Sequence, residues 1–89
     1  MSASENGTKL AILPEQCRAA RALLNLSQDQ LVALSGVPKR TLVRFEAAEV
    51  KPQMRTVDAL QRALEAAGVE FIAENGGGAG VRLKRGAPA

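Results

Sequence analysis

A sharp corner between two short helical segments constrains the fold of this chain more than any other feature. The stretch SQDQLVALSGVPKRTLVRFE covers residues 27–46 and carries Gly36 near its centre. Glycine adopts positive φ at low cost, so Gly36 can end one helix and turn the chain steeply into the next. A helix pair of this kind is either a packing device or a means of placing one helix in a DNA groove.

Both helices of this pair have start signals. Ser27 followed by Gln30 forms the Ser-x-x-Gln pattern of a capping box, which predicts a helix that begins there and stops at Gly36. Pro38 then opens a second helix, because a missing N–H costs nothing in the first turn. We expect this second helix to run to about Glu46.

Two more helices are predicted on either side of the pair. One runs from Pro14 to about Asn25; the other follows a loop at 47–55, has Thr56 as its N-cap and ends at Gly68. Their apolar residues recur at helical spacing: Cys17, Ala20, Leu23 and Leu24 in the first helix, and Val57, Leu60, Ala63, Leu64 and Ala67 in the other.

The end of the chain has a different pattern. VEFI at 69–72 and VRLK at 81–84 have the composition of two strands. The segment AENGGGAG between them is too rich in glycine for a helix and is typical of a hairpin loop. The sequence therefore predicts a short β-hairpin after the last helix.

These elements divide the chain into three parts. Residues 1–13 form a flexible N-terminal segment, in which KLAIL at 9–13 is either a short strand or the lead-in to the first helix. Residues 14–69 form a helical domain, and residues 70–89 form the hairpin and a loose tail. A chain of 89 residues is long enough for one small, mostly α-helical domain.

The composition argues against several kinds of site. With Cys17 as the single cysteine and no histidine, the chain offers no Cys–His pair and no plausible zinc site, so we expect no metal, no cofactor and no enzyme activity. GGGAG lacks the Lys-Ser/Thr of a phosphate-binding loop. We expect Cys17 to be a small core residue rather than a redox switch.

Location follows from the same composition. A lone cysteine cannot form a disulfide within the chain, which is consistent with a reducing cytoplasm. No apolar run approaches the length of a membrane span, and the polar start MSASENGTK does not resemble a signal peptide. We therefore expect a cytoplasmic protein that does not contact membranes.

The stretch from Gln28 to Phe45 resembles the helix-turn-helix of the phage-repressor and Cro family, also called XRE-type regulators. Gly36 stands at the motif's ninth position, where the family has glycine, and LSQDQL and TLVRFE are similar to the family's usual helix entry and recognition-helix end. Apolar residues occupy the fourth, tenth, fifteenth and eighteenth positions: Leu31, Val37, Leu42 and Phe45. The resemblance covers roughly residues 14 to 69. It implies a lambda-repressor-like domain of four to five helices, here with a short C-terminal β-hairpin.

Two residues depart from the family's pattern. Val32 stands where the family usually has alanine, which predicts a slightly wider or tilted packing of the two motif helices. Pro38 stands where serine often caps the recognition helix; it stiffens the turn but supplies no capping oxygen.

The resemblance implies binding of double-stranded DNA, with the helix after Gly36 in the major groove. Base contacts are predicted for the residues that Leu42 and Phe45 leave outward: Lys39, Arg40, Val43 and Arg44. Phosphate contacts are predicted for four others: Gln28, Thr41, Lys51 and Arg55. Five basic residues between positions 39 and 55 face only two acidic ones, in a chain of formal charge +3, and this excess suits a DNA-facing surface.

Two residues of the motif have open interpretations. The family usually has a carboxylate at Glu46 that ties the recognition helix to an arginine on the first helix; Arg21 is its natural partner, and Asp29 is the competing partner of Arg21. Leu34 falls where the family often has a charged residue. It either pads the edge of the core or marks a protein contact.

The hairpin bears on assembly, because two strands alone are marginal in water. We expect it to help form a homodimer through Phe71, Ile72, Val81 and Leu83; the alternative is that it folds back on the chain's own helices. Such a dimer would read a palindromic operator whose half-sites lie about one DNA turn apart.

The most consistent function is sequence-specific regulation of transcription, by repression rather than activation. The alternative is an antitoxin-like or adaptor protein that binds another protein through its C-terminal region.

Overall fold

The computed structural model describes residues 11–85 of the chain. Within them four helices precede an antiparallel hairpin: α2 (Pro14–Leu24), α3 (Gln28–Ser35), α4 (Lys39–Glu46), α5 (Met54–Ala67), β1 (Val69–Ile72) and β2 (Gly80–Leu83). This confirms the prediction of a mostly helical, lambda-repressor-like fold with a short C-terminal hairpin. None of these helices has the length and hydropathy that crossing a bilayer demands.

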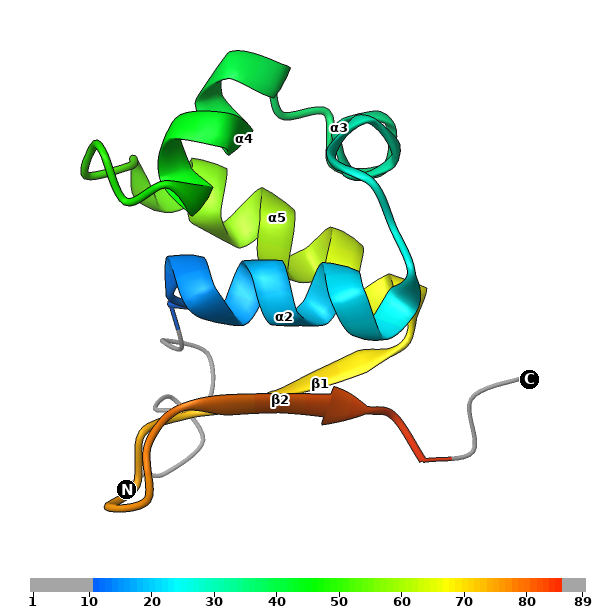
Figure 1. Cartoon of the computed structure of the whole chain (residues 1–89), viewed down its shortest axis with the longest axis vertical. Helices are drawn as coiled ribbons and strands as arrows, with labels where there is room; N and C mark the ends of the chain where they lie inside the picture. The colour runs from blue at the N-terminus through cyan, green and yellow to red at the C-terminus, as the bar shows by residue number, and fades with distance from the viewer. Residues whose placement is uncertain (1–10, 86–89) are drawn as a thin grey trace.

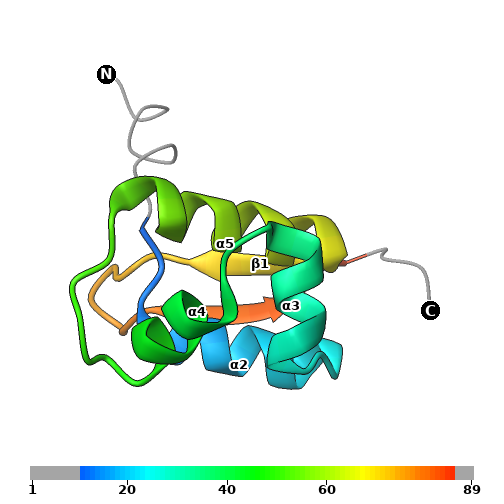
Figure 2. The ribbon, with the colours of Figure 1, turned by 90° about the horizontal axis from the view of Figure 1, so that it is seen from above.

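The elements form three layers (Figure 1). α2 and α5 lie in the middle, α3 and α4 cover one side of them, and the hairpin covers the other side. Seen from above, α3 and α4 lie over α2 and α5 with the strands beneath (Figure 2). The hairpin therefore folds back on the chain's own helices.

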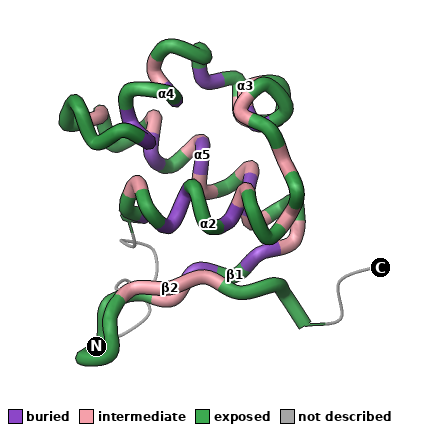
Figure 3. The backbone as a smooth tube through the Cα atoms, in the orientation of Figure 1, coloured by how far each residue is buried: buried purple, intermediate pink, exposed green. Residues whose placement is uncertain are grey.

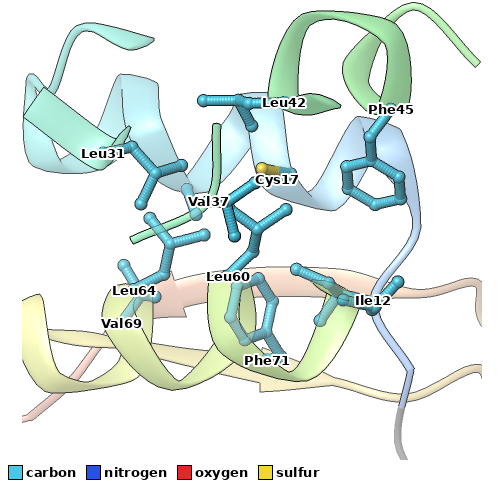
Figure 4. Packing of buried hydrophobic residues seen from close by; sticks show 12 residues of the cluster. Ile12, Cys17, Leu31, Val37, Leu42, Phe45, Leu60, Leu64, Val69 and Phe71 are labelled. Atoms are coloured by element: carbon cyan, nitrogen blue, oxygen red, sulfur yellow. The ribbon is translucent and has the colours of Figure 1, made fainter. Parts of the chain in front are cut away.

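One apolar core joins the layers. It contains fully buried leucines from α3, α4 and α5, and Val69 from β1; Phe45 joins it from α4 and Phe71 from β1 (Figure 4). The buried stretches of each element face the middle of the molecule (Figure 3), and Val37, in the loop between α3 and α4, is buried with them. Because burying one such side chain stabilises the fold by about 1.5–3 kcal/mol, this core is the main source of stability.

The signals at the ends of α3 are confirmed. The Gln30 N–H donates to Ser27 Oγ at 3.0 Å, and the Ser27 N–H donates to Gln30 Oε1 at 2.8 Å, which completes the capping box. Gly36 ends the helix in the left-handed region, at φ 77°. No heavy atom lies within 4 Å of the position that a Cβ would take there, so the backbone conformation alone favours glycine.

The predicted start of α5 is wrong. The helix begins at Met54, and its N-cap is Gln53 rather than Thr56, whose N–H donates to the Gln53 carbonyl at 3.0 Å. Pro52 disfavours helical backbone in the residue before it but not in the residues after it. Met54 and Arg55 are good helix formers, so helical backbone is favourable before Thr56 is reached.

Smaller corrections concern four residues. Pro38 is the N-cap of α4 rather than its first residue, and β2 begins one residue earlier than predicted, at Gly80. Leu23 and Ala67 are exposed, although their spacing assigned them to the core. Periodicity does not determine how wide the buried stripe of a helix is, because neighbouring elements decide that.

Predictions for the chain ends lie partly outside the described residues. This holds for the prediction made for residues before 11 and for the prediction made for residues after 85. Of the KLAIL stretch, residues 11–13 are neither helix nor strand and lead into α2, with Ile12 buried in the core.

The hairpin is fastened to α2 by one buried amide, that of Gln16. Its Nε2 donates to the carbonyls of Ile72 at 3.2 Å and Gly80 at 2.8 Å, and its Oε1 accepts from the Leu13 N–H at 2.8 Å. Ile72 and Gly80 are the strand pair nearest the hairpin loop. A single side chain therefore fixes both strands to the start of α2.

Candidate nucleic-acid interface

α4 has one buried side and one exposed side. Leu42, Phe45 and Glu46 are buried against the rest of the chain. The four residues predicted to contact bases are all exposed: Lys39, Arg40, Val43 and Arg44. α4 itself belongs to the layer nearest the viewer in Figure 2. The structure thus brings the whole predicted base-contacting set to the surface of one helix.

The start of α4 carries positive charge. Its N-cap, Pro38, makes no side-chain hydrogen bond, and no acidic residue lies in the first turn. The first turn of a helix leaves N–H groups without helical partners, and here Lys39 and Arg40 add their charges to that end. One carboxylate reaches it from α3: Asp29 Oδ1 lies 2.8 Å from Lys39 Nζ.

The predicted phosphate-contacting residues come from three places. Gln28 is the first residue of α3, and its Nε2 donates to Glu46 Oε1 at 2.9 Å, so its carboxamide is tied to the end of α4. Thr41 is half-buried on α4, and Lys51 is exposed in the loop that follows. Arg55 is exposed in the first turn of α5 rather than in that loop.

A buried carboxylate, that of Glu46, holds the end of α4. The side chain accepts from Arg21 Nε and Nη2, both at 2.8 Å, from Gln28, and from Cys17 Sγ at 3.2 Å. The predicted tie between Glu46 and Arg21 is therefore confirmed. Asp29, the competing partner, lies against α4's first residue instead.

The ionisation of this cluster follows from its contacts. Burial alone would raise the pKa of Glu46, but the hydrogen bonds from Arg21, Gln28 and Cys17 outweigh it and hold that pKa below its usual range. Burial, and then the bond to Glu46, raises the pKa of Cys17. Cys17 is thus a buried thiol that donates a hydrogen bond, as suits the predicted core residue and not a reactive thiolate.

Sequence reasoning missed two residues that position α4 and the hairpin. Arg18 donates from Nη1 to the Glu46 carbonyl, one turn before Arg21 reaches the carboxylate of the same residue. The spacing of the two arginines on α2 is a signal that could have revealed Arg18. Gln16 gave no comparable signal, because its acceptors are backbone carbonyls of distant strands.

Leu34 and Val32 can now be placed. Leu34 is 56% exposed on α3, so it does not pad the core, and a protein contact at this position stays a prediction. Val32 is half-buried and packs against the core, in the position where the family usually has alanine.

The residues predicted to form a dimer do not share one surface. Phe71 is only 8% exposed and belongs to the chain's own core, so we correct that assignment. Ile72 and Val81 are half-buried, whereas Leu83 on β2 is 53% exposed. In the sequence, apolar strand residues that pack against the chain's own helices look the same as apolar strand residues that pack against a partner.

Comparison with protein-family models supports the helical part of this interpretation. The chain matches a model described as helix-turn-helix over residues 18–71, which is more than half of its length. The matched span contains α3, α4 and α5 and reaches into β1. No curated protein matches the chain.

Proposed function

The chain belongs to the XRE-type helix-turn-helix family, and from this we propose that it is a repressor that reads the major groove with α4 as a homodimer. Membership makes it a DNA-binding transcription regulator in general terms. The proposal adds the mode of reading, the assembly and the direction of regulation.

One observation carries the proposal: α4 exposes three cations and a valine on the side opposite its buried residues. Lysine and arginine can donate to guanine O6 and N7 in the major groove, and valine can touch a thymine methyl. The buried side includes Glu46, whose hydrogen bonds fix the helix against α2 and α3. A rigidly held helix with an exposed basic side is suited to reading bases.

Phosphate contacts would fix the register on the duplex. Gln28 supports this part, because Glu46 takes one hydrogen of its carboxamide and leaves the other to donate. Lys51 and Arg55, exposed after α4 and at the start of α5, would neutralise further phosphates, and the half-buried Thr41 on α4 would donate to another.

The free edge of β2 supports a homodimer. The Lys84 N–H donates to the Gly68 carbonyl at 2.8 Å, so alternation along the ladder turns the backbone groups of Val81 and Leu83 away from β1. On β1 the residues whose backbone groups point away from β2 include Val69, which is fully buried and so cannot pair with another chain. A second copy would therefore add its strand at β2, not at β1.

Symmetry favours this arrangement for a DNA reader. Two antiparallel strands are related by a two-fold axis perpendicular to their sheet. Because α3 and α4 lie on the side of the molecule opposite the hairpin (Figure 1), that axis would present both α4 helices on one side. The strands overlap in Figure 1 and lie side by side in Figure 2, so the sheet would extend along the shortest dimension, 21 Å.

The two α4 helices of such a dimer would read half-sites about one DNA turn, roughly 34 Å, apart. Pairing centred on Val81 would also set Arg82 opposite Gly80 of the second copy and avoid two opposed arginines.

Selection of DNA from a random pool tests the reading helix. We expect the wild type to select a palindrome, and Arg40→Ala with Arg44→Ala to lose about a hundredfold or more in affinity for it, since each good base contact is worth about 1–3 kcal/mol. Arg62→Ala with Arg85→Ala removes the same charge away from α4 and should cost far less. A pool without a preferred sequence, bound equally by the double variant, would contradict the proposal.

Sedimentation tests the assembly. We expect Leu83→Lys to dissociate the dimer, because it places a charge at the pairing edge. Leu34→Lys changes an equally exposed leucine on α3 and should leave the dimer intact. Truncation of the hairpin is a poor test, since it would uncover the core beside Val69 and Phe71. A Leu83→Lys protein that is still dimeric excludes β2 as the interface.

The second candidate is an antitoxin-like or adaptor protein, favoured by the exposure of Leu34. It gains if the pool yields no preferred sequence.

A further inference from the structure

We propose that Asp29 sets the DNA specificity of this chain by holding Lys39; the inference rests on the proposed reading of DNA by α4. Asp29 is the second residue of α3 and Lys39 is the first residue of α4, so the pair bridges the starts of both motif helices. Lys39 Nζ lies 2.8 Å from Asp29 Oδ1, and the two side chains are 54% and 74% exposed. Both groups therefore face the solvent that DNA would replace.

The position of Asp29 opposes sequence-independent binding. The start of α4 has no acidic residue of its own and no side-chain cap, and it carries Lys39 and Arg40. Such an end attracts any phosphate, whatever the sequence around it. The Asp29 carboxylate neutralises one of these charges and repels a phosphate that approaches the same place. Binding to arbitrary DNA is weakened as a result.

The same contact favours a base over a phosphate as the target of Lys39. An ammonium has three hydrogens, so one can stay on Asp29 while two reach the O6 and N7 acceptors of a guanine. A phosphate offers no such advantage, because it is repelled by the carboxylate that the lysine keeps. Asp29 is thus a positioning residue: it holds the flexible Lys39 side chain where its ammonium can donate to a base edge but not to a phosphate.

A second ion pair provides a matched control. Arg62 Nε lies 2.9 Å from Asp58 Oδ2 on α5, with side chains 77% and 53% exposed. Both ends of this pair lie on one helix, away from α4. Asp29→Asn and Asp58→Asn therefore remove the same charge from comparably exposed pairs, and both keep the shape of the side chain.

The experiment compares wild type, Asp29→Asn and Asp58→Asn on two duplexes, the selected site and a scrambled sequence of the same composition, at several salt concentrations. Asp29→Asn should bind the scrambled duplex about fivefold tighter, the upper range for one exposed charge pair. Its affinity for the selected site should change less than about twofold. The ratio of the affinity for the selected site to the affinity for the scrambled duplex then falls. The salt dependence of the affinity for scrambled DNA steepens by about one released counterion.

Asp58→Asn should leave that ratio at the wild-type value. A ratio unchanged in Asp29→Asn, or lowered equally in Asp58→Asn, overturns the inference. Lys39→Ala supplies the final comparison: because Asp29 acts partly by holding Lys39, adding Asp29→Asn to it should lower the ratio by less than it does in the wild type. An equal drop in both backgrounds would show that Asp29 does not act through Lys39. If wild type binds both duplexes equally, the proposed function itself has failed, which separates the two outcomes.

Discussion

The two ends of α4 are held in opposite ways. At its last residue, the Glu46 carboxylate is almost fully buried and accepts four hydrogen bonds from three side chains. At its first residue, Lys39 makes an exposed ion pair with Asp29, and the N-cap Pro38 makes no side-chain hydrogen bond. A buried charge network is costly to break, whereas an exposed pair contributes little. The end of α4 is therefore anchored by a buried network, and the side chain at its start is held only by an exposed ion pair.

Loss of the anchor should give the largest effect. Glu46→Ala leaves the Arg21 guanidinium without its buried partner, which should lower the free energy of unfolding by about 3–5 kcal/mol. Urea unfolding at neutral pH measures the change. Glu49→Ala is the control, because its exposed contact with Arg44 at 3.9 Å should be worth less than about 1 kcal/mol. Equal losses in both variants would mean that the end of α4 has no anchor.

Acid should weaken the anchor without a mutation. The pKa of Glu46 is lower in the folded chain than in the unfolded chain, so its contribution to stability is complete above the ordinary glutamate pKa. That contribution is lost as the pH falls through the lower, folded value. The stability difference between wild type and Glu46→Gln, measured by urea unfolding across this pH range, should shrink toward acid. A difference that stays constant would contradict the lowered pKa.

The turn before α4 should give a smaller effect. Gly36→Ala puts a Cβ at φ 77°, which should cost about 1–2 kcal/mol. Because no atom lies near that Cβ, the cost is conformational rather than steric against a neighbour. Gly36→Asn should recover part of the loss, since asparagine tolerates this conformation. Thermal unfolding compares the variants; equal losses for alanine and asparagine would point to a different cause.

The turn after α4 should give the smallest effect, with the opposite sign. Ala48 has φ 59°, in a turn closed by its own N–H to the Phe45 carbonyl at 2.9 Å and by the Glu49 N–H to the Arg44 carbonyl at 3.0 Å. Glycine is usual at this position, so Ala48→Gly should stabilise the fold by about 0.5–1 kcal/mol. Ala47→Gly, at an ordinary helical φ of −83°, should destabilise it. If thermal unfolding shows that Ala48→Gly and Ala47→Gly are both less stable than the wild type, this explanation is refuted.

Local signals made much of the fold predictable. The capping box at Ser27, the left-handed Gly36 and the buried pair Leu42 and Phe45 each depend on residues close in sequence, and the structure has them as expected. The start of α5 was not predictable in this way, because Thr56 has the side chain of a good N-cap residue and yet lies inside the first turn of the helix.

Long-range partners were not predictable in the same way. The spacing on α4 predicted that Lys39 is exposed, but no pattern indicates which carboxylate an exposed lysine will meet. The strand pattern indicated that the apolar Phe71 would be covered, but not by which surface. The roles of the base- and phosphate-contacting residues stay predictions, because they depend on a duplex that the chain alone does not contain.

The Gln16 amide has a consequence for biosynthesis. Its bond to the Gly80 carbonyl spans 64 residues, so the contacts of α2 are complete only after β2 has been synthesised. At about 5–20 residues per second, a ribosome needs roughly 3–13 s to add that length. Throughout this interval α2 lacks the hairpin that covers one of its sides. The nascent chain therefore completes this contact only after Gly80 has been synthesised, and a product that stops before Gly80 leaves that side of α2 uncovered.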